Sequence, residues 1–99
     1  MSGSTSWREL RGRRMTEPGA EEAYVAARLA FELGRTVREV RERRGWTQAT
    51  LAEASGLTQP AVARFEAGGT VPTLPVLERL AHALDLDLVV KLAPRTSAA

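Results

Sequence analysis

Apolar side chains recur every three or four residues through the first half of the chain, which is the period of an amphipathic helix. The stripe consists of Ala20, Tyr24, Ala27, Phe31, Gly34, Val37 and Val40. It predicts a helix over about 18–33 and another over about 34–44, either continuous or bent at Gly34. A glycine inside a helix costs about 1 kcal/mol relative to alanine, so we expect that bend or a close packing contact. Further helices are predicted over about 47–55, 58–67 and 73–84.

Two of these helices, joined by a sharp turn, lie between Gly45 and Glu66 in the stretch GWTQATLAEASGLTQPAVARFE. Thr47 and Thr58 are placed to cap them, because a threonine hydroxyl can accept a hydrogen bond from an orphan backbone N–H. Gly56 lies between them, where a tight turn favours a left-handed backbone. This pattern indicates a helix-turn-helix, in which the second helix usually enters the DNA major groove. The alternative is an ordinary helical hairpin in a small bundle.

A different period follows the last helix. Leu86, Leu88, Val90 and Leu92 alternate with Asp87, Val89 and Lys91, and Pro94 ends the pattern. Alternation predicts a short β-strand over 87–93, but the chain offers no second strand, and a lone strand leaves its edges unpaired. We expect pairing with the same strand of a second subunit across a two-fold axis, through Leu88, Val89, Val90 and Leu92. The alternatives are a tail laid on its own domain and a strand added to the sheet of another protein.

Composition narrows the class of protein. The chain has 99 residues, 43% of them hydrophobic, which allows one globular domain with a modest core. It has no cysteine, which excludes disulfides and thiolate metal sites. No apolar run reaches the length of a membrane span, and the first residues lack the apolar core of a signal peptide. We therefore expect a cytoplasmic protein with no membrane partner.

Charge is distributed in blocks, although the net charge is only +2. Basic blocks over 1–14 and 35–46 flank an acidic block over 15–34. The second basic block lies directly before the helix-turn-helix, where DNA phosphates would pass. Arg43 and Arg44 in this block are candidate phosphate contacts, and the alternative is a solvated arginine-rich helix face.

Nothing in the sequence favours catalysis. His82 is the only histidine, and without cysteine it can form neither a histidine cluster nor a thiolate triad. Glu21 and Glu22 are adjacent, so they face different sides of a helix. We expect no enzyme activity, no bound metal and no cofactor.

The segment TQATLAEASGLTQPAVARFEAGGTVPTLPVLERLAHALD resembles the Cro/C1-type (XRE) helix-turn-helix family. The likeness extends over about 33–86 and implies an all-α, five-helix, lambda-repressor-like DNA-binding domain. In that family the first turn of the third helix and the next turn read bases, which implies base contacts by Gln59, Pro60 and Arg64. The resemblance also implies backbone contacts near Thr47, Gln48, Thr58 and Ala61, and a structural ion pair between Arg41 and Glu66. The expected ligand is a pseudo-palindromic double-stranded operator bound by a homodimer.

The flanking segments SWRELRGRR, EPGAEEAYVAARLAFELG and LDLVVKL resemble HigA-like antitoxins of bacterial toxin–antitoxin pairs. This resemblance implies a repressor that neutralises a HigB/RelE-type ribonuclease toxin and regulates its own operon. Candidate toxin contacts are Trp7, Leu10, Tyr24 and Phe31; for the last two, packing in the core is an equal alternative. The rival functions are a stand-alone regulator without a toxin and an adaptor that bridges proteins.

The predicted organisation follows from these segments. It comprises a partly disordered basic segment over 1–16, a helix within 17–33, the helix-turn-helix domain over 34–86, a strand over 87–93 and a disordered tail over 94–99.

Overall fold

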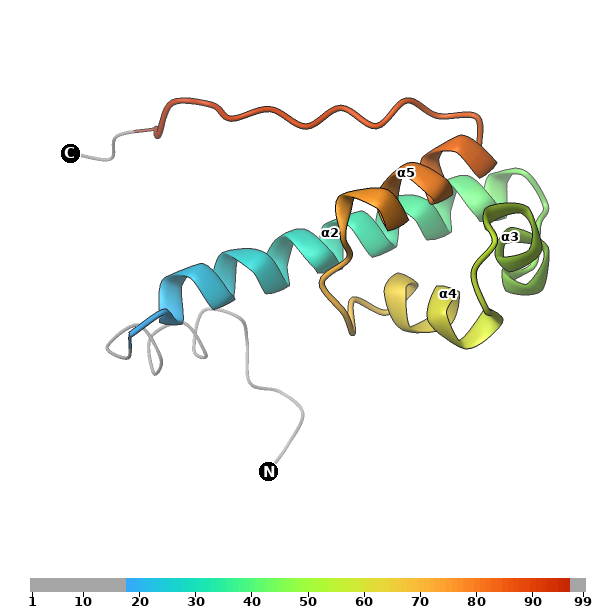
Figure 1. The fold of residues 1–99 in the computed structure, drawn as a ribbon, viewed down its shortest axis with the longest axis horizontal. Coiled ribbons are helices and arrows are strands. Elements are labelled where there is room, and N and C mark those ends of the chain that lie inside the picture. The colour runs from blue at the N-terminus through green and yellow to red at the C-terminus, as the bar shows by residue number, and fades with distance from the viewer. Residues whose placement is uncertain (1–17, 97–99) are drawn as a thin grey trace.

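The computed structural model describes residues 18–96. Within this range the chain forms four helices and then an extended tail (Figure 1). The helices are α2 (Ala20–Arg43), α3 (Gln48–Ser55), α4 (Gln59–Glu66) and α5 (Leu74–Ala83). The three short helices gather around the C-terminal half of α2, and the N-terminal half of α2 projects beyond them. None of the helices in residues 18–96 is long and apolar enough to cross a membrane.

Helix α2 is continuous for 24 residues, so the two predicted helices of this region are one. Gly34 lies in its middle without a break and is buried. A Cβ atom at this position would overlap the backbone carbonyl oxygen of Phe65 and touch that of Glu66. The expected close packing contact is therefore what Gly34 provides, and it lets α4 cross α2 at backbone distance.

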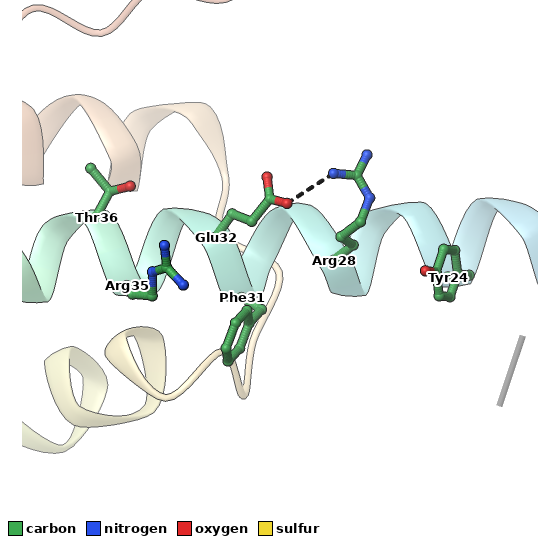
Figure 2. A pocket seen from close by; sticks show the side chains of 6 residues that line it. All are labelled: Tyr24, Arg28, Phe31, Glu32, Arg35 and Thr36. Atoms are coloured by element: carbon green, nitrogen blue, oxygen red, sulfur yellow. Dashed lines mark hydrogen bonds and ion pairs between the residues drawn. The ribbon is translucent and has the colours of Figure 1, made fainter. Parts of the chain in front are cut away.

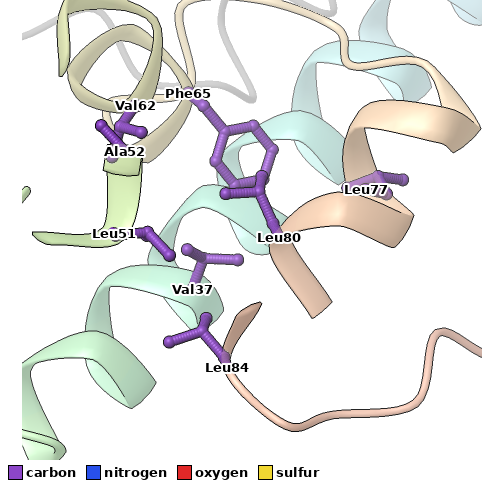
Figure 3. Close-up of a cluster of buried hydrophobic side chains, with 8 residues drawn as sticks. All are labelled: Val37, Leu51, Ala52, Val62, Phe65, Leu77, Leu80 and Leu84. Carbon is purple, nitrogen blue, oxygen red and sulfur yellow. The ribbon is translucent and has the colours of Figure 1, made fainter. Parts of the chain in front are cut away.

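The core lies where the four helices meet (Figure 3). Its buried side chains are Val37, Leu51, Ala52, Val62, Phe65, Leu77, Leu80 and Leu84. Leu51, Val62 and Leu80 are fully buried, so each of the three short helices contributes at least one side chain without solvent contact. Burial of such a side chain contributes about 1.5–3 kcal/mol, and this shared core is what fixes α3 and α4 relative to each other.

The short helices begin at threonine caps. Thr47 Oγ1 accepts a hydrogen bond from the Thr50 N–H at 3.0 Å, and Thr58 Oγ1 accepts one from the Ala61 N–H at 3.2 Å. Thr73 caps α5 in the same way. Gly56 ends α3 with φ of 74°, in the left-handed region expected for the turn. The local predictions for the helix-turn-helix are therefore confirmed.

The expectation of five helices and a C-terminal strand is wrong for the residues that the structure describes. The predicted extra helix and the first domain helix merge into α2, and no helix follows α5 before residue 96. Asp85 has φ of 60°, which ends the helical path. Residues 87–93 run through the extended tail but are not a strand, because that tail meets no other strand within residues 18–96. Leu88 is the one residue of the tail that packs against the core.

One buried ion pair joins α2 to α4. The Arg41 guanidinium donates to both carboxylate oxygens of Glu66, from Nε to Oε2 at 2.7 Å and from Nη2 to Oε1 at 3.0 Å. The third nitrogen, Nη1, donates to the Trp46 carbonyl oxygen at 2.7 Å. The side chains of Arg41 and Glu66 are only 10% and 3% exposed. The hydrogen bonds to Glu66 raise the pKa of Arg41, so the guanidinium stays charged.

We expect Gly34→Ala to lower the free energy of unfolding by about 1–3 kcal/mol, as overpacking does when the neighbouring atoms are backbone. The gain in helix propensity is smaller than this loss because the carbonyl of Phe65 cannot move without shifting α4. Urea unfolding measures the change. Thr36→Ala, at an exposed position of the same helix, is the control and should stay within about 0.5 kcal/mol of the parent. Equal stability of the two variants would contradict the close contact.

We expect Glu66→Ala to cost about 3–5 kcal/mol, because it strands the buried guanidinium of Arg41 without its counter-charge. Glu32→Ala is the matched control, since it removes an exposed ion pair with Arg28 whose contribution is at most about 1 kcal/mol. Thermal and urea unfolding of both variants provide the comparison. Similar losses in the two would show that the buried pair does not hold α2 and α4 together.

Candidate nucleic-acid interface

Helix α4 exposes one face to solvent. Gln59, Pro60 and Arg64, the three predicted base contacts, are all exposed on it. The opposite face carries Val62 and Phe65 into the core. The position of α4 is therefore set by packing, and its outer side chains are free to contact a ligand.

The middle of this exposed face consists of small side chains. Helical spacing places Ala63 and Ala67 between the three predicted base contacts, one turn and two turns after Gln59. Neither alanine was among the residues singled out in the sequence. The signal was present in the helical period, which places positions 59, 63 and 67 on one line. Small residues there would let the helix backbone approach a groove floor closely, with longer side chains on either side.

Gln48 lies beside this face at the first turn of α3. Its Nε2 atom donates to Glu66 Oε1 at 3.1 Å, so the amide is anchored to the same carboxylate that binds Arg41. An amide nitrogen carries two hydrogens, and this bond uses one of them. Gln48 thus keeps a donor in a fixed position, which is what a phosphate contact requires.

A polar hollow opens next to Gln48, where α2, α3 and α4 meet. It is lined by Arg38, Arg41, Gln48, Ala63, Glu66 and Ala67. Arg38 Nε donates to Glu42 Oε2 at 3.1 Å, in an exposed ion pair that solvent screens. The hollow therefore combines an exposed arginine with an amide held by Glu66, on one side of the α4 face.

The other predicted backbone contacts divide into two groups. Arg43 is exposed at the end of α2. Arg44 is used within the fold, because Nη1 donates to the Leu84 carbonyl oxygen at 3.2 Å and the guanidinium lies 4.7 Å from the centre of the Trp46 ring. Thr47 and Thr58 serve as helix caps, and the Thr58 cap also uses the N–H of Ala61. Arg43, which is exposed, and Gln48, whose amide nitrogen keeps one hydrogen, are left as the candidates with a donor not used in these contacts.

The candidate toxin contacts lie on α2 or outside the described residues. Trp7 and Leu10 fall outside the described residues. Tyr24 is half-buried, and Phe31 is 44% exposed. Both line a hollow that extends along the middle of α2, together with Arg28, Glu32, Arg35 and Thr36 (Figure 2). The Phe31 side chain packs against Gly68 in the turn after α4 and is not part of the central core.

No cluster suited to a metal ion is found among residues 18–96: no three histidine, aspartate or glutamate side chains lie together there. His82 is exposed on α5.

The family described as "Helix-turn-helix domain" matches residues 32–92. The chain is 31% identical over 70 residues to the HTH-type transcriptional regulator SutR of Escherichia coli (strain K12), an alignment that covers 71% of this chain and 39% of the relative. The chain thus spans about two fifths of that relative's length.

A solved structure extends the comparison to the fold. The restriction-modification controller protein C.AhdI from Aeromonas hydrophila superposes with a TM-score of 0.57 and 36% sequence identity. The match covers 59% of this chain and 88% of that one. The family match includes α3, the turn and α4 with its exposed face. The chain therefore belongs to the helix-turn-helix domain family.

Proposed function

We propose that the protein is a sequence-specific transcriptional repressor that binds its operator through α4. The observation that carries this function is the outer face of α4, where exposed Gln59 and Arg64 flank a surface of small side chains. The buried pair between Arg41 and Glu66 fixes that face on α2. A rigid helix with a narrow, polar outer face is what entry into the major groove requires.

Each exposed side chain of α4 has a role in this proposal. Gln59 pairs with an adenine and Arg64 with a guanine, since each can form two parallel hydrogen bonds to that base. Pro60 offers only apolar contact, which suits the methyl group of a thymine. Gln48 and Arg43 bind phosphates on the flank of the groove. With only Gln59 and Arg64 forming hydrogen bonds to bases, we expect each half-site to contain few specified base pairs.

A homodimer on a pseudo-palindromic operator completes the proposal. A two-fold protein matches two half-sites about 34 Å apart on one face of the DNA. Support comes from the tail over 87–93, which carries exposed apolar side chains and has no partner strand in the described part of its own chain. The relatives, named as a transcriptional regulator and a restriction-modification controller, support a regulatory role for the present chain.

The finer assignment is the antitoxin of a HigB/RelE-type ribonuclease. It is supported by the resemblance of the flanking segments to HigA-like proteins and by the exposed ring of Phe31 on the projecting half of α2. A stand-alone regulator is the alternative, since the names of the similar proteins mention no toxin. A protein-bridging adaptor would use the same fold without reading DNA.

Binding to the DNA upstream of the gene tests the function. The purified protein is titrated against that duplex and a scrambled duplex over a series of salt concentrations. A preference of about a hundredfold or more, with affinity that falls steeply in salt, is the expected result. Equal weak binding to both duplexes would favour the adaptor.

We expect Arg64→Ala to weaken operator binding by about 5- to 150-fold, which corresponds to the 1–3 kcal/mol carried by one bidentate base contact. Gln48→Ala should weaken binding to the operator and to the scrambled duplex by similar factors, because a phosphate contact carries no sequence information. Arg79→Ala, at an exposed arginine of α5, is the control and should bind as the parent does. An Arg64→Ala variant that loses no preference would exclude this arginine as a base reader.

The antitoxin role predicts that Phe31→Glu abolishes neutralisation of a small ribonuclease encoded beside the gene while operator affinity changes less than about twofold. A charge at this exposed position would be desolvated in a partner interface. Growth rescue on co-expression reports neutralisation, and Val71→Glu, at a position that is 65% exposed, is the matched control. Full rescue by Phe31→Glu would remove this face from the toxin interface, and an operon without a ribonuclease would favour the stand-alone regulator.

A further inference from the structure

The backbone of the tail is unpaired for most of its length. The Leu86 N–H donates to the Ala81 carbonyl oxygen at 2.7 Å and completes the end of α5. From residue 87 to residue 96, the backbone makes no hydrogen bond to other backbone groups of the described chain. An extended segment of this kind presents a row of donors and acceptors that fits another strand.

The tail also has an inner face that is only partly covered. Leu88 packs against the core, and the alternation of side chains in an extended chain puts Val90 and Leu92 on the same face. These two side chains are nevertheless 63% and 100% exposed. The apolar layer that begins at Leu88 is thus left open along the tail.

Helix α2 contributes a second uncovered apolar surface. Val25 and Leu29, one helical turn apart, are 36% and 45% exposed on its projecting half. They line a hollow together with Arg95 and Thr96, because the tail runs back along α2 (Figure 1). The uncovered side chains of the tail and of α2 therefore belong to one side of the molecule.

We propose that this side is covered by the tail of a second copy of the chain, which pairs antiparallel with the first tail in a register centred on Val89. Val89 then lies opposite Val89 of the second copy, and Leu88 lies opposite Val90 of the second copy. This pairing deepens the homodimer of the proposed function and rests on it. It specifies which atoms meet at the two-fold axis.

Two requirements select the register. The apolar faces of both tails must point to the same side, so opposite residues must both be even-numbered or both be odd-numbered. Charges must also pair, and a register centred on Val89 places Asp87 opposite Lys91 of the second copy, twice by symmetry. Centring on residue 87 or 91 would oppose like charges at the axis. Centring on residue 88 or 90 would place an apolar side chain opposite Asp87.

The surrounding surface explains how so short a ribbon is stable. Two strands alone are marginal in water and need an apolar surface to pack on. Leu88 of each copy already contacts the core, and Val25 and Leu29 extend that surface along α2. The outer face, with Asp87, Val89 and Lys91, stays in solvent.

Cysteine cross-linking tests the register, and the chain contains no cysteine that could interfere. Under mild oxidation, Val89→Cys should form a covalent dimer in high yield, because residues directly opposite in an antiparallel pair have Cα atoms within the disulfide range. In this register, residue 90 lies opposite residue 88 of the second copy, two positions from residue 90 of that copy. Val90→Cys should therefore cross-link at least tenfold more slowly than Val89→Cys. Val71→Cys, at an exposed position outside the tail, is the background control. Cross-linking of Val89→Cys no faster than Val71→Cys would overturn the register.

Charge exchange gives a second test that leaves the fold untouched, since Asp87 and Lys91 are both exposed. Asp87→Lys and Lys91→Asp should each raise the dimer dissociation constant at least tenfold, whereas an equimolar mixture should regain the parent value as a heterodimer. Glu53→Lys on α3, also exposed, carries the same charge change as Asp87→Lys and should dimerise normally. Sedimentation equilibrium measures the dimer dissociation constant of the three variants and of the mixture. Failure of the mixture to associate would overturn the pairing.

Measuring operator binding with the same preparations distinguishes failure of the strand pairing from failure of the repressor function. A parent chain that binds its operator but sediments as a monomer at every concentration overturns the strand pairing and leaves DNA binding in place. A parent dimer with the expected cross-links that shows no preference for its operator supports the pairing and overturns the repressor function.

Discussion

The fold depends above all on the ion pair between Arg41 and Glu66. Its two ends belong to α2 and α4, and its spare nitrogen binds the carbonyl of Trp46 at the corner that leads into α3. The same carboxylate holds Gln48, so one buried charge pair organises three helices. Such a pair costs desolvation when it forms. Removing either partner would leave the other charge buried without its main counter-charge.

Gly34 sets the distance between α2 and α4 at which Arg41 and Glu66 can pair. With no side chain at this position, the backbone of α4 lies directly on α2. A larger residue would separate the helices and pull Glu66 from Arg41. The hydrogen bonds between Glu66 and both Arg41 and Gln48 therefore presuppose the glycine, and the position of the outer face of α4 depends on a contact in the middle of α2.

The local features were predictable from the sequence because their causes are local. Thr47 and Thr58 cap the helices that follow them, and the turn at Gly56 has the expected left-handed backbone. The sequence predicted either a bend or a close packing contact at Gly34. Which of the two occurs depends on the carbonyl of Phe65, about thirty positions away in the chain. Tertiary contacts of this kind leave no periodic signal in the chain.

The predicted site and strand show the same limit. The exposure of Gln59 and Arg64 follows from helical period, but the bond between Gln48 and Glu66 arises only when α3 meets α4. Arg44 was singled out for its charge, whereas its contact with the Leu84 carbonyl depends on where α5 ends. The prediction of a strand over 87–93 was wrong for the described residues. Alternating side chains indicate an extended backbone, but a β-strand also needs a second backbone to pair with.

The unbroken course of α2 has a mechanical consequence. Phe31 and Arg41 lie on the same continuous helix, α2, with Phe31 nearer its N-terminus and Arg41 in the half that packs against the other helices. A protein seated on the N-terminal half of α2 would be held at a constant position relative to the outer face of α4, which we propose enters the DNA groove. Its effect on operator occupancy would then be set by where its bulk falls against DNA or against a neighbouring subunit, and not by any change in the shape of α4.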